Sequence, residues 1–198
     1  MRARRQKILD DPEAYRPELM AEDAANLLGH LKIAEADVMG YSMGGRIAAH
    51  LAIAHPRQVR ALVIGGMGFA LVEGIGAEED IVAALEAPSL DDAVGEIGRA
   101  YRKFAEQTRS DRRALAACIL GQRETISPQR LGMIRAPTLV AVGEKDKVAG
   151  SAAALAELIP GAEVLAIPNR DHMLATGDRA FKAGVLDFLG RNGLRALQ

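Results

Sequence analysis

The sequence predicts an α/β fold in which helices flank a parallel sheet, and two observations carry this prediction. Four short runs are almost continuously apolar, as strands buried on both faces of a parallel sheet are: ADVMGY (36–41), ALVIGG (61–66), TLVAVG (138–143) and EVLAIP (163–168). The first two runs start 25 residues apart, and so do the last two. That spacing accommodates one crossover helix, so each pair is expected to form a βαβ unit.

Helical patterns fill the spaces around these strands. One helix is expected from about Met43 until Pro56, and another from Ser151, as its N-cap, to the turn at Pro160. Two further helices each place apolar side chains on one face. The first covers residues 17–31, with Met20, Ala24, Leu27, Leu28 and Leu31 on that face, and the second covers residues 176–189, with Phe181, Val185 and Leu189.

The interval between the second and third strands is too long for a single crossover. Its sequence predicts several helices, which are AEEDIVAALEA (77–87), LDDAVGEIGRAYRKFAEQ (90–107) and SDRRALAACILGQ (110–122). A helical insertion at this point is typical of a lid over a site at the carboxyl edge of the sheet. We therefore expect a single domain over residues 1–198 with a lid over residues 70–135.

Composition narrows the class of partner. The formal net charge is −1, so no overall field favours nucleic acid or an anionic membrane, and no run reaches the ~18 apolar residues of a membrane span. The basic start, MRARRQK, is expected to be a solvated terminus. Cys118, the one cysteine, is expected to pack as a small apolar residue in a cytoplasmic protein. Neither a metal site nor a cofactor is predicted.

A candidate nucleophile lies between the first strand and the helix after it. Gly40-x-Ser42-x-Gly44 matches the G-x-S-x-G elbow, in which a serine occupies a sharp strand-to-helix turn. Such a turn strains the serine backbone and brings the helix close to the strand, so Cβ atoms at Gly40, Gly44 and Gly45 would be expected to clash. The N–H group of Met43, at the start of the helix, would point at the oxygen of an attacked carbonyl.

A base and an acid follow in the loops after later strands. Asp146 comes three residues after the third strand, and His172 comes four residues after the fourth. Because parallel strands end at one edge of a sheet, Ser42, Asp146 and His172 are expected to converge as a catalytic triad. Glu144 and Asp171 remain alternative acids. The other histidines are expected to be structural: His50 packed in the elbow helix, His55 at its end, and His30 exposed.

Two other features have competing interpretations. The segment GGMGFALVEGIG (65–76) is similar to a phosphate-binding glycine loop, but its spacing departs from G-x-G-x-x-G and no acidic ribose partner follows. The lid is rich in basic side chains, which either form a solvated face among acidic residues or meet a carboxylated substrate. These side chains belong to Arg99, Arg102, Lys103, Arg109, Arg112 and Arg113.

From about residue 11 to residue 189 the chain resembles the α/β-hydrolase superfamily, in particular its lidded bacterial esterases, lactonases and C–C bond hydrolases. The matching pieces are GYSMGG, AHP, ALVIGG, PTLVAVGEKD and AIPNRDHM. The resemblance implies a serine hydrolase that acts on a small ester-like molecule, with Ser42 attacking, His172 transferring the proton and Asp146 holding the imidazolium. Members with dehalogenase or epoxide-hydrolase chemistry carry an aspartate where this chain has Ser42.

The chain departs from this family ahead of the elbow. The resemblance implies four earlier strands and an HG-type loop that supplies the second oxyanion donor, but no HG pair precedes Ser42 and four strands do not fit there. We expect the strand at 36–41 to lie at an uncovered edge, through which copies of the chain could self-associate. Two hypotheses remain: a serine hydrolase, or a truncated hydrolase-like protein that binds a ligand or partner without catalysis.

Overall fold

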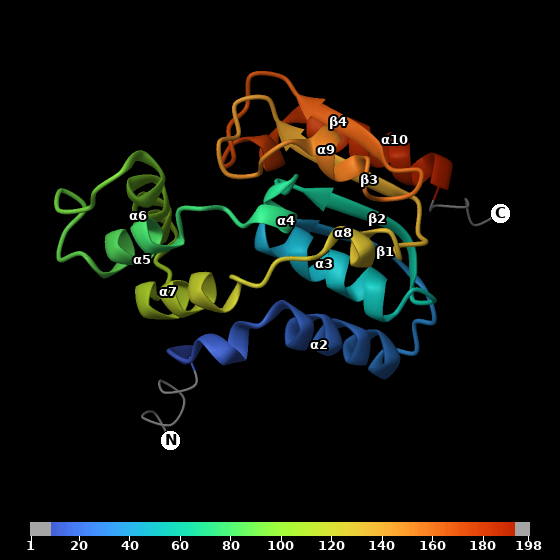
Figure 1. The fold of residues 1–198 in the computed structure, drawn as a ribbon, viewed down its shortest axis with the longest axis horizontal. Helices are drawn as coiled ribbons and strands as arrows, with labels where there is room; N and C mark the ends of the chain where they lie inside the picture. The colour runs from blue at the N-terminus through green and yellow to red at the C-terminus, as the bar shows by residue number, and fades with distance from the viewer. Residues whose placement is uncertain (1–8, 193–198) are drawn as a thin grey trace. The chain divides into compact units, whose positions relative to one another are not determined.

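The computed structural model describes residues 9–192 (Figure 1), so the basic start MRARRQK lies outside the described residues. These residues divide into two compact units. We call residues 9–19 with 75–124 the helical unit, and residues 20–74 with 125–192 the sheet unit. The range predicted as a lid, 70–135, extends into both units, and its action as a lid stays a prediction.

The sheet unit contains the four predicted strands, all parallel, in the order β1-β2-β3-β4. The strands are β1 (Ala36–Tyr41), β2 (Val59–Gly65), β3 (Thr138–Gly143) and β4 (Glu163–Ile167). The helices are α2 (Pro17–His30), most of which lies in this unit, α3 (Met43–Ala54), α4 (Ala70–Glu73), α8 (Pro128–Leu131), α9 (Ala152–Ala156), the 3₁₀ turn η2 (Ala175–Gly177) and α10 (Arg179–Asn192). The α/β fold class predicted from the sequence is therefore confirmed.

The two central strands are buried on both faces, as their apolar runs predict, but the outer strands are not. Along β4 the burial alternates, and Val164 is 46% exposed. On β1, Met39 is 56% exposed. Within the described residues, β1 pairs with β2 alone and β4 with β3 alone, so each is an edge strand. The edge position of β1 agrees with the expectation from the sequence, whereas β4 is less covered than its apolar run suggested.

Side chains of β2 contribute to an apolar core on each face of the sheet. Successive strand residues point to opposite faces, so Ala61 and Val63 face one way while Leu62 and Ile64 face the other. The helix α3 contacts β1 and β2, and its Gly45 approaches Ile64. The opposite face packs against α10 in a cluster that comprises Ala61, Val63, Leu139, Ala141, Ile167, Ala175, Phe181, Val185 and Phe188.

Helix positions follow the sequence signals more closely than helix faces do. The Ser151 hydroxyl accepts a hydrogen bond from Ala154 N (3.2 Å), which confirms it as the N-cap of α9. In α2 the leucine-rich face is not the buried one, because Leu27 is 56% exposed while Ala21 and Ala25 are buried. Periodicity identified the helix correctly, but small residues, Ala21 and Ala25, form its buried face.

The helical unit contains the 3₁₀ turn η1 (Pro12–Tyr15), α5 (Glu78–Glu86), α6 (Glu96–Thr108) and α7 (Arg112–Gly121). Its small core includes Ile81, Leu85, Ala105 and Ala116. The helix α6 starts six residues later than predicted, because Gly95 has a positive φ of 77° and Asp92 accepts hydrogen bonds from Ser89 in a preceding turn.

Three arginines of the helical unit donate hydrogen bonds to its backbone carbonyls. Arg102 is only 3% exposed, and its Nη1 donates to the carbonyls of Ala84 and Ala87 at the end of α5. Arg112 Nη1 also donates to the Ala87 carbonyl, and Arg99 Nη1 donates to the Ala93 carbonyl. Arg102 is therefore buried and binds carbonyls at the end of α5. Arg99 and Arg112 bind carbonyls as well but remain exposed, as the solvated-face interpretation expects.

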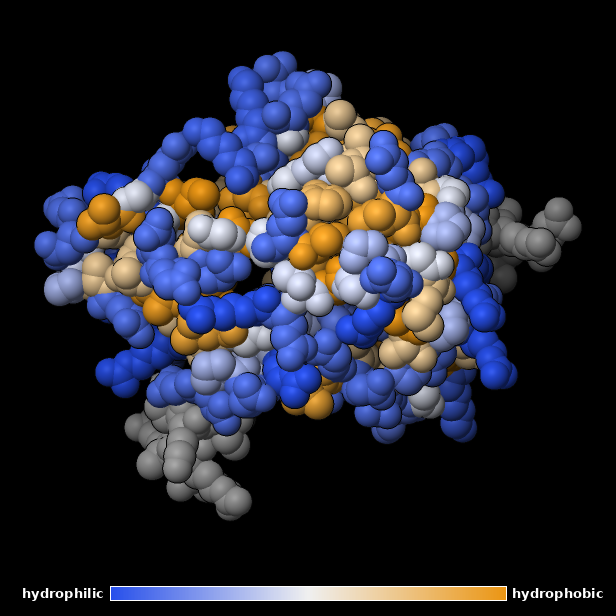
Figure 2. Space-filling view, in the orientation of Figure 1, coloured by the Kyte–Doolittle hydropathy of each residue, from blue (hydrophilic) through white to orange (hydrophobic). Residues whose placement is uncertain are grey.

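On the face that Figure 2 shows, hydrophilic and hydrophobic residues are interspersed. Of the helices that the structure describes, none has both the length and the apolar character needed to cross a membrane.

Candidate active site

Ser42 occupies the predicted turn between a strand and a helix. The strand β1 ends at Tyr41 and the helix α3 begins at Met43. Between them Ser42 has φ 55° and ψ −119°, a conformation that side-chain-bearing residues rarely adopt and that costs about 1–3 kcal/mol. Its N–H donates to the carbonyl of Gly65 at 2.7 Å, which ties the turn to the end of β2. The strained serine expected of an elbow is therefore present.

The three elbow glycines differ in how much they are needed. A Cβ atom at Gly40 would lie 1.9 Å from the Gly44 carbonyl oxygen, so no side chain fits there. At Gly45 a Cβ atom would lie 3.2 Å from the Gly65 carbonyl oxygen, which is tight. At Gly44 it would have no heavy atom within 4 Å. The expected clash at Gly44 is therefore wrong, because that position on α3 faces open space and not β1.

The sheet brings Ser42, His172 and Asp146 together, although up to 130 residues separate them. His172 Nε2 lies 2.9 Å from Ser42 Oγ, and His172 Nδ1 lies 2.8 Å from Asp146 Oδ2. The side chain of His172 is 8% exposed and that of Asp146 is fully buried. In the tautomer that carries its hydrogen on Nδ1, the imidazole donates to the carboxylate and presents Nε2 as the acceptor for the serine hydroxyl.

Asp146 is oriented by its own loop after β3. Its Oδ1 accepts hydrogen bonds from the N–H groups of Val148 (2.9 Å) and Ala149 (3.0 Å), while Oδ2 faces His172. One oxygen is therefore held by the backbone and the other is aimed at the imidazole. Such contacts satisfy a buried carboxylate and keep it from rotating.

The two alternative acids have other partners. Glu144 Oε2 accepts the N–H of Asn169 at 2.9 Å, in the loop that carries His172. Asp171 Oδ1 accepts the N–H groups of Met173 (3.1 Å) and Leu174 (2.9 Å), which closes a turn within the same loop. Both carboxylates shape the loop around His172, and Asp146 is the one hydrogen-bonded to its ring.

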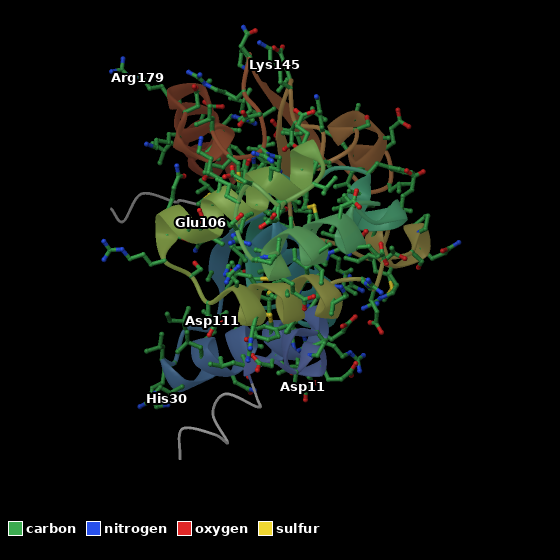
Figure 3. All side chains as sticks on the ribbon, turned by 90° about the vertical axis from the view of Figure 1, so that its left-hand side faces the viewer. Asp11, His30, Glu106, Asp111, Lys145 and Arg179 are labelled. Atoms are coloured by element: carbon green, nitrogen blue, oxygen red, sulfur yellow. The ribbon has the colours of Figure 1, made fainter. Side chains whose placement is uncertain are left out.

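The loop that carries His172 is also fastened to β3 and to the start of α10. The N–H of Lys145 donates to the Arg170 carbonyl at 2.9 Å, and a Cβ atom at Gly143 would lie 2.3 Å from that same oxygen. Arg170 Nε donates to Asp178 Oδ2 at 2.6 Å, and this hydrogen bond lowers the pKa of the Asp178 carboxyl. The side chains of Lys145, which precedes Asp146, and of Arg179, which follows Asp178, extend outward (Figure 3).

The remaining histidines occupy structural positions, as expected. His50 is 1% exposed within α3, with Arg130 Nη2 3.5 Å from its Nδ1. His55 is the C-cap of α3, and its Nε2 lies 2.7 Å from Glu22 Oε1. His30 is exposed at the end of α2 (Figure 3).

The glycine-rich segment after β2 packs against the loop of Asp146. The N–H groups of Gly68 and Ala70 both donate to the Ala149 carbonyl, at 2.8 and 3.1 Å, and that of Phe69 donates to the Ser151 carbonyl. Arg46, 2% exposed on α3, donates to the Ala70 carbonyl at 3.3 Å. These donors bind protein oxygens, so the segment braces the acid loop and does not form a phosphate cradle.

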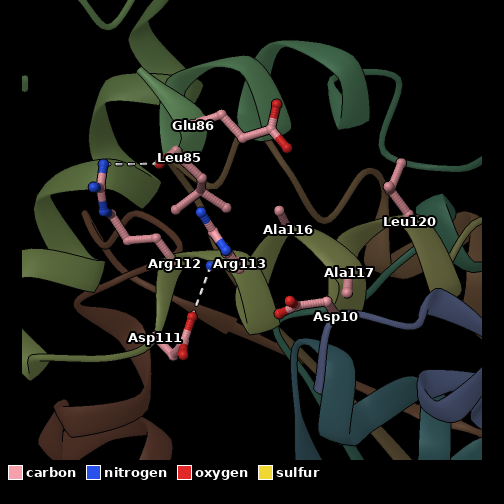
Figure 4. A pocket seen from close by; sticks show the side chains of 9 residues that line it. All are labelled: Asp10, Leu85, Glu86, Asp111, Arg112, Arg113, Ala116, Ala117 and Leu120. Atoms are coloured by element: carbon pink, nitrogen blue, oxygen red, sulfur yellow. Dashed lines mark hydrogen bonds between the residues drawn. The ribbon is translucent and has the colours of Figure 1, made fainter. Parts of the chain in front are cut away.

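Residues 9–192 contain no group of three or more His, Cys, Asp or Glu side chains placed as metal ligands. A pocket of about 710 Å³ lies in the helical unit (Figure 4). Charged side chains, including Asp111 and Arg113, share its wall with apolar ones, including Leu85 and Leu120. None of Ser42, Asp146 and His172 lines it.

Sequence reasoning missed Tyr41 as a contributor to this site. Its hydroxyl donates to the backbone carbonyl of His172 at 2.6 Å. The residue between the glycine and the serine of G-x-S is variable in the pattern, so no sequence signal distinguishes this tyrosine from a strand residue. Its contact forms only when the loops after β1 and β4 meet.

The fold agrees with the comparisons. A model of the alpha/beta hydrolase family matches residues 8–183. The chain therefore belongs to the alpha/beta hydrolase family, as the sequence resemblance suggested.

Curated relatives match over shorter stretches. The chain is 41% identical over 66 residues to a 2-hydroxymuconate semialdehyde hydrolase of Pseudomonas sp. strain CF600, which covers 32% of this chain and 23% of that protein. It is 38% identical over 74 residues to a pimeloyl-[acyl-carrier protein] methyl ester esterase of Neisseria meningitidis, which covers 37% and 27%. The match thus spans about a quarter of the length of these relatives.

Solved structures match over most of the chain. A hydrolase from Pseudomonas aeruginosa superposes with a TM-score of 0.72 and 26% identity, covering 89% of this chain and 72% of that one. An enol-lactonase from Burkholderia xenovorans gives 0.70 with 22% identity, covering 90% and 74%, and this likeness supports the fold alone. The chain is thus a member of a hydrolytic family.

Proposed function

We propose that this protein is a serine hydrolase that acts on a small ester or a related acyl compound. The observation that carries the proposal is the hydrogen-bonded chain from Ser42 Oγ through His172 to Asp146. Family membership supports hydrolysis in general. One curated relative is a methyl ester esterase, which supports the choice of an ester, and another is a semialdehyde hydrolase, which supports a related acyl compound.

In this proposal Ser42 Oγ attacks the acyl carbon while its proton passes to His172 Nε2. The carbonyl π electrons move to the oxygen, and a tetrahedral intermediate forms. When it collapses, the bond to the alcohol breaks and His172 gives its proton to the leaving oxygen. Water then attacks the acyl-enzyme with His172 again as base, which releases the acid and restores Ser42. Asp146 stabilises the imidazolium in both halves.

The developing oxyanion needs hydrogen-bond donors. We assign one of them to the N–H of Met43, because it follows the nucleophile at the first position of α3, where helix N–H groups and the helix dipole favour negative charge. Loss of one oxyanion donor typically costs about 10²–10³ in rate.

Two further assignments rest on sequence and stay proposals. Residues 70–135 would act as a lid whose side chains select the substrate. A cytoplasmic setting suits a chain whose one cysteine, Cys118, is a buried free thiol. The rival hypothesis, a hydrolase-like binding protein without catalysis, predicts the same fold and is separated from the first by activity alone.

A panel of short-chain p-nitrophenyl esters tests the proposal. We expect hydrolysis by the purified chain that falls to the background rate in Ser42→Ala, with acetate and butyrate esters preferred over long chains. A matched control is Ser151→Ala, which changes a serine that caps α9. Hydrolysis that persists in Ser42→Ala, or that is absent from the wild type with every ester, would reject the proposal.

A further inference from the structure

Tyr41 connects the residue before the nucleophile to the residue that carries the base. It is the last residue of β1, directly before Ser42. Its hydroxyl donates to the backbone carbonyl of His172 at 2.6 Å, which is short for a bond between a hydroxyl and a carbonyl. The rings of the two residues also meet, with centroids 5.6 Å apart. The elbow and the loop after β4 are thus joined by a contact separate from the one between Ser42 and His172.

The ring of Tyr41 has little freedom to move. Phe181 meets its edge in a T-shaped contact, with centroids 5.9 Å apart and planes at 88°. At the end of β2, a Cβ atom at Gly65 would lie 2.8 Å from Tyr41 Cδ2, and just after the strand one at Gly66 would lie 2.5 Å from Cζ. The ring therefore lies directly on two glycines, and its hydroxyl is held at a defined place.

The His172 loop is fastened from two sides. Toward β3, Lys145 N–H holds the Arg170 carbonyl, and Glu144 holds the Asn169 N–H. Toward β1, Tyr41 holds the carbonyl of His172 itself. The first set of contacts fixes the loop relative to Asp146, and the Tyr41 contact fixes it relative to Ser42.

We propose that Tyr41 is a positioning residue whose hydroxyl sets the separation between His172 Nε2 and Ser42 Oγ. The inference rests on the proposed function, since it concerns the same pair of atoms. Proton transfer from serine to histidine requires the two atoms at hydrogen-bond distance, and displacements of about 1 Å can lower rates by about 10². Without the hydroxyl, the loop would keep its attachment to Asp146 but would drift relative to Ser42.

The test compares Tyr41→Phe with Tyr15→Phe. Tyr15, in the helical unit, also donates its hydroxyl to a backbone carbonyl, that of Leu9 at 3.0 Å, so the chemical change is the same. Both variants and the wild type are treated with a fluorophosphonate probe, and the labelling rate constant is measured per folded molecule, with folding checked by circular dichroism and melting temperature. For the p-nitrophenyl ester that the wild type hydrolyses best, kcat and KM are measured separately.

For Tyr41→Phe we expect the labelling rate and kcat to fall together by about tenfold while KM stays within about twofold, and for Tyr15→Phe we expect neither to change. A merely structural role would lower the melting temperature of Tyr41→Phe without lowering its rate per folded molecule, and that result would overturn the proposal. If Tyr41→Phe does not fold, Phe181→Leu loosens the ring while keeping the hydroxyl; an unchanged labelling rate in that variant would also overturn it.

The wild type separates this inference from the proposed function. A wild-type chain that the probe does not label contradicts the serine hydrolase itself. Labelling of wild type and Tyr41→Phe at equal rates contradicts the role of Tyr41 only.

Discussion

Asp146 binds the Nδ1 side of His172 at 2.8 Å with a carboxylate that is fully buried and whose second oxygen is held by two backbone N–H groups. This pairing fixes the imidazole with Nε2 toward Ser42. Two other carboxylates, Glu144 and Asp171, come close in sequence but bind backbone N–H groups of the histidine loop. The pairing therefore selects one acid from three candidates on geometric grounds.

The first prediction concerns this choice. Asp146→Asn should lower kcat by about 10³–10⁴ with a smaller change in KM, because an amide favours the wrong imidazole tautomer and cannot stabilise the imidazolium. Glu144→Gln and Asp171→Asn keep an oxygen acceptor for their backbone partners and should stay within about threefold of wild type. Ester hydrolysis by the three variants measures the effect, and a larger loss in either control than in Asp146→Asn would reassign the acid.

The second prediction concerns the elbow glycines. Gly40→Ala should destabilise the fold by about 3 kcal/mol or more, because its Cβ would lie 1.9 Å from a backbone oxygen of α3 that cannot move aside. Gly44→Ala should leave stability unchanged or raise it by up to about 1 kcal/mol, since it adds a helix-favouring residue in open space. Urea unfolding measures both, and equal destabilisation by the two variants would contradict the close approach at Gly40.

The third prediction concerns Cys118. Burial in α7 raises the pKa of its thiol from 9.0 to about 11, so at pH 8 the folded protein holds about 10² less thiolate than the unfolded chain. Native protein should react with Ellman's reagent at least that much more slowly than urea-unfolded protein. Because the pKa is raised on folding, this group adds no pH dependence to stability below about pH 9 and destabilises the fold as the pH rises from 9 toward 11. Rapid native labelling at pH 8 would contradict a buried thiol.

The fourth prediction concerns the edge of the sheet. We expect copies of the chain to associate through β1, where Met39 is 56% exposed, and this stays a prediction from the sequence and the strand order. Light scattering after gel filtration should give about twice the chain mass of 21.1 kDa. Lysine side chains on edge strands commonly oppose pairing with another chain, so Met39→Lys should shift the protein toward monomer. A wild type that remains monomeric at high micromolar concentration would rule this association out.

Much of the fold follows from local sequence signals. Apolar runs placed all four strands, and Ser151 marked the start of α9, because burial and capping act over a few residues. Each of Ser42, Asp146 and His172 follows a predicted strand. Because the carboxyl ends of parallel strands lie at one edge of a sheet, this was enough to place the three residues on loops at that edge.

Other features depend on contacts that no local pattern encodes. The exposed leucines of α2 and the open side of Gly44 follow from how helices meet the sheet, which periodicity does not specify. The delayed start of α6 follows from a positive φ at Gly95. Tyr41 reaches a residue 131 positions away, so its role could only emerge from the folded chain.

Probe labelling followed by peptide mass spectrometry examines whether Ser42 is a nucleophile activated by His172. We expect a fluorophosphonate to modify the purified chain at one site, on the peptide that contains Ser42. We also expect modification to disappear in Ser42→Ala and to be slowed by about 10³ or more in His172→Ala, which should remain folded. Absence of modification in the folded wild type, or modification that persists at the same rate in His172→Ala, would contradict this activation.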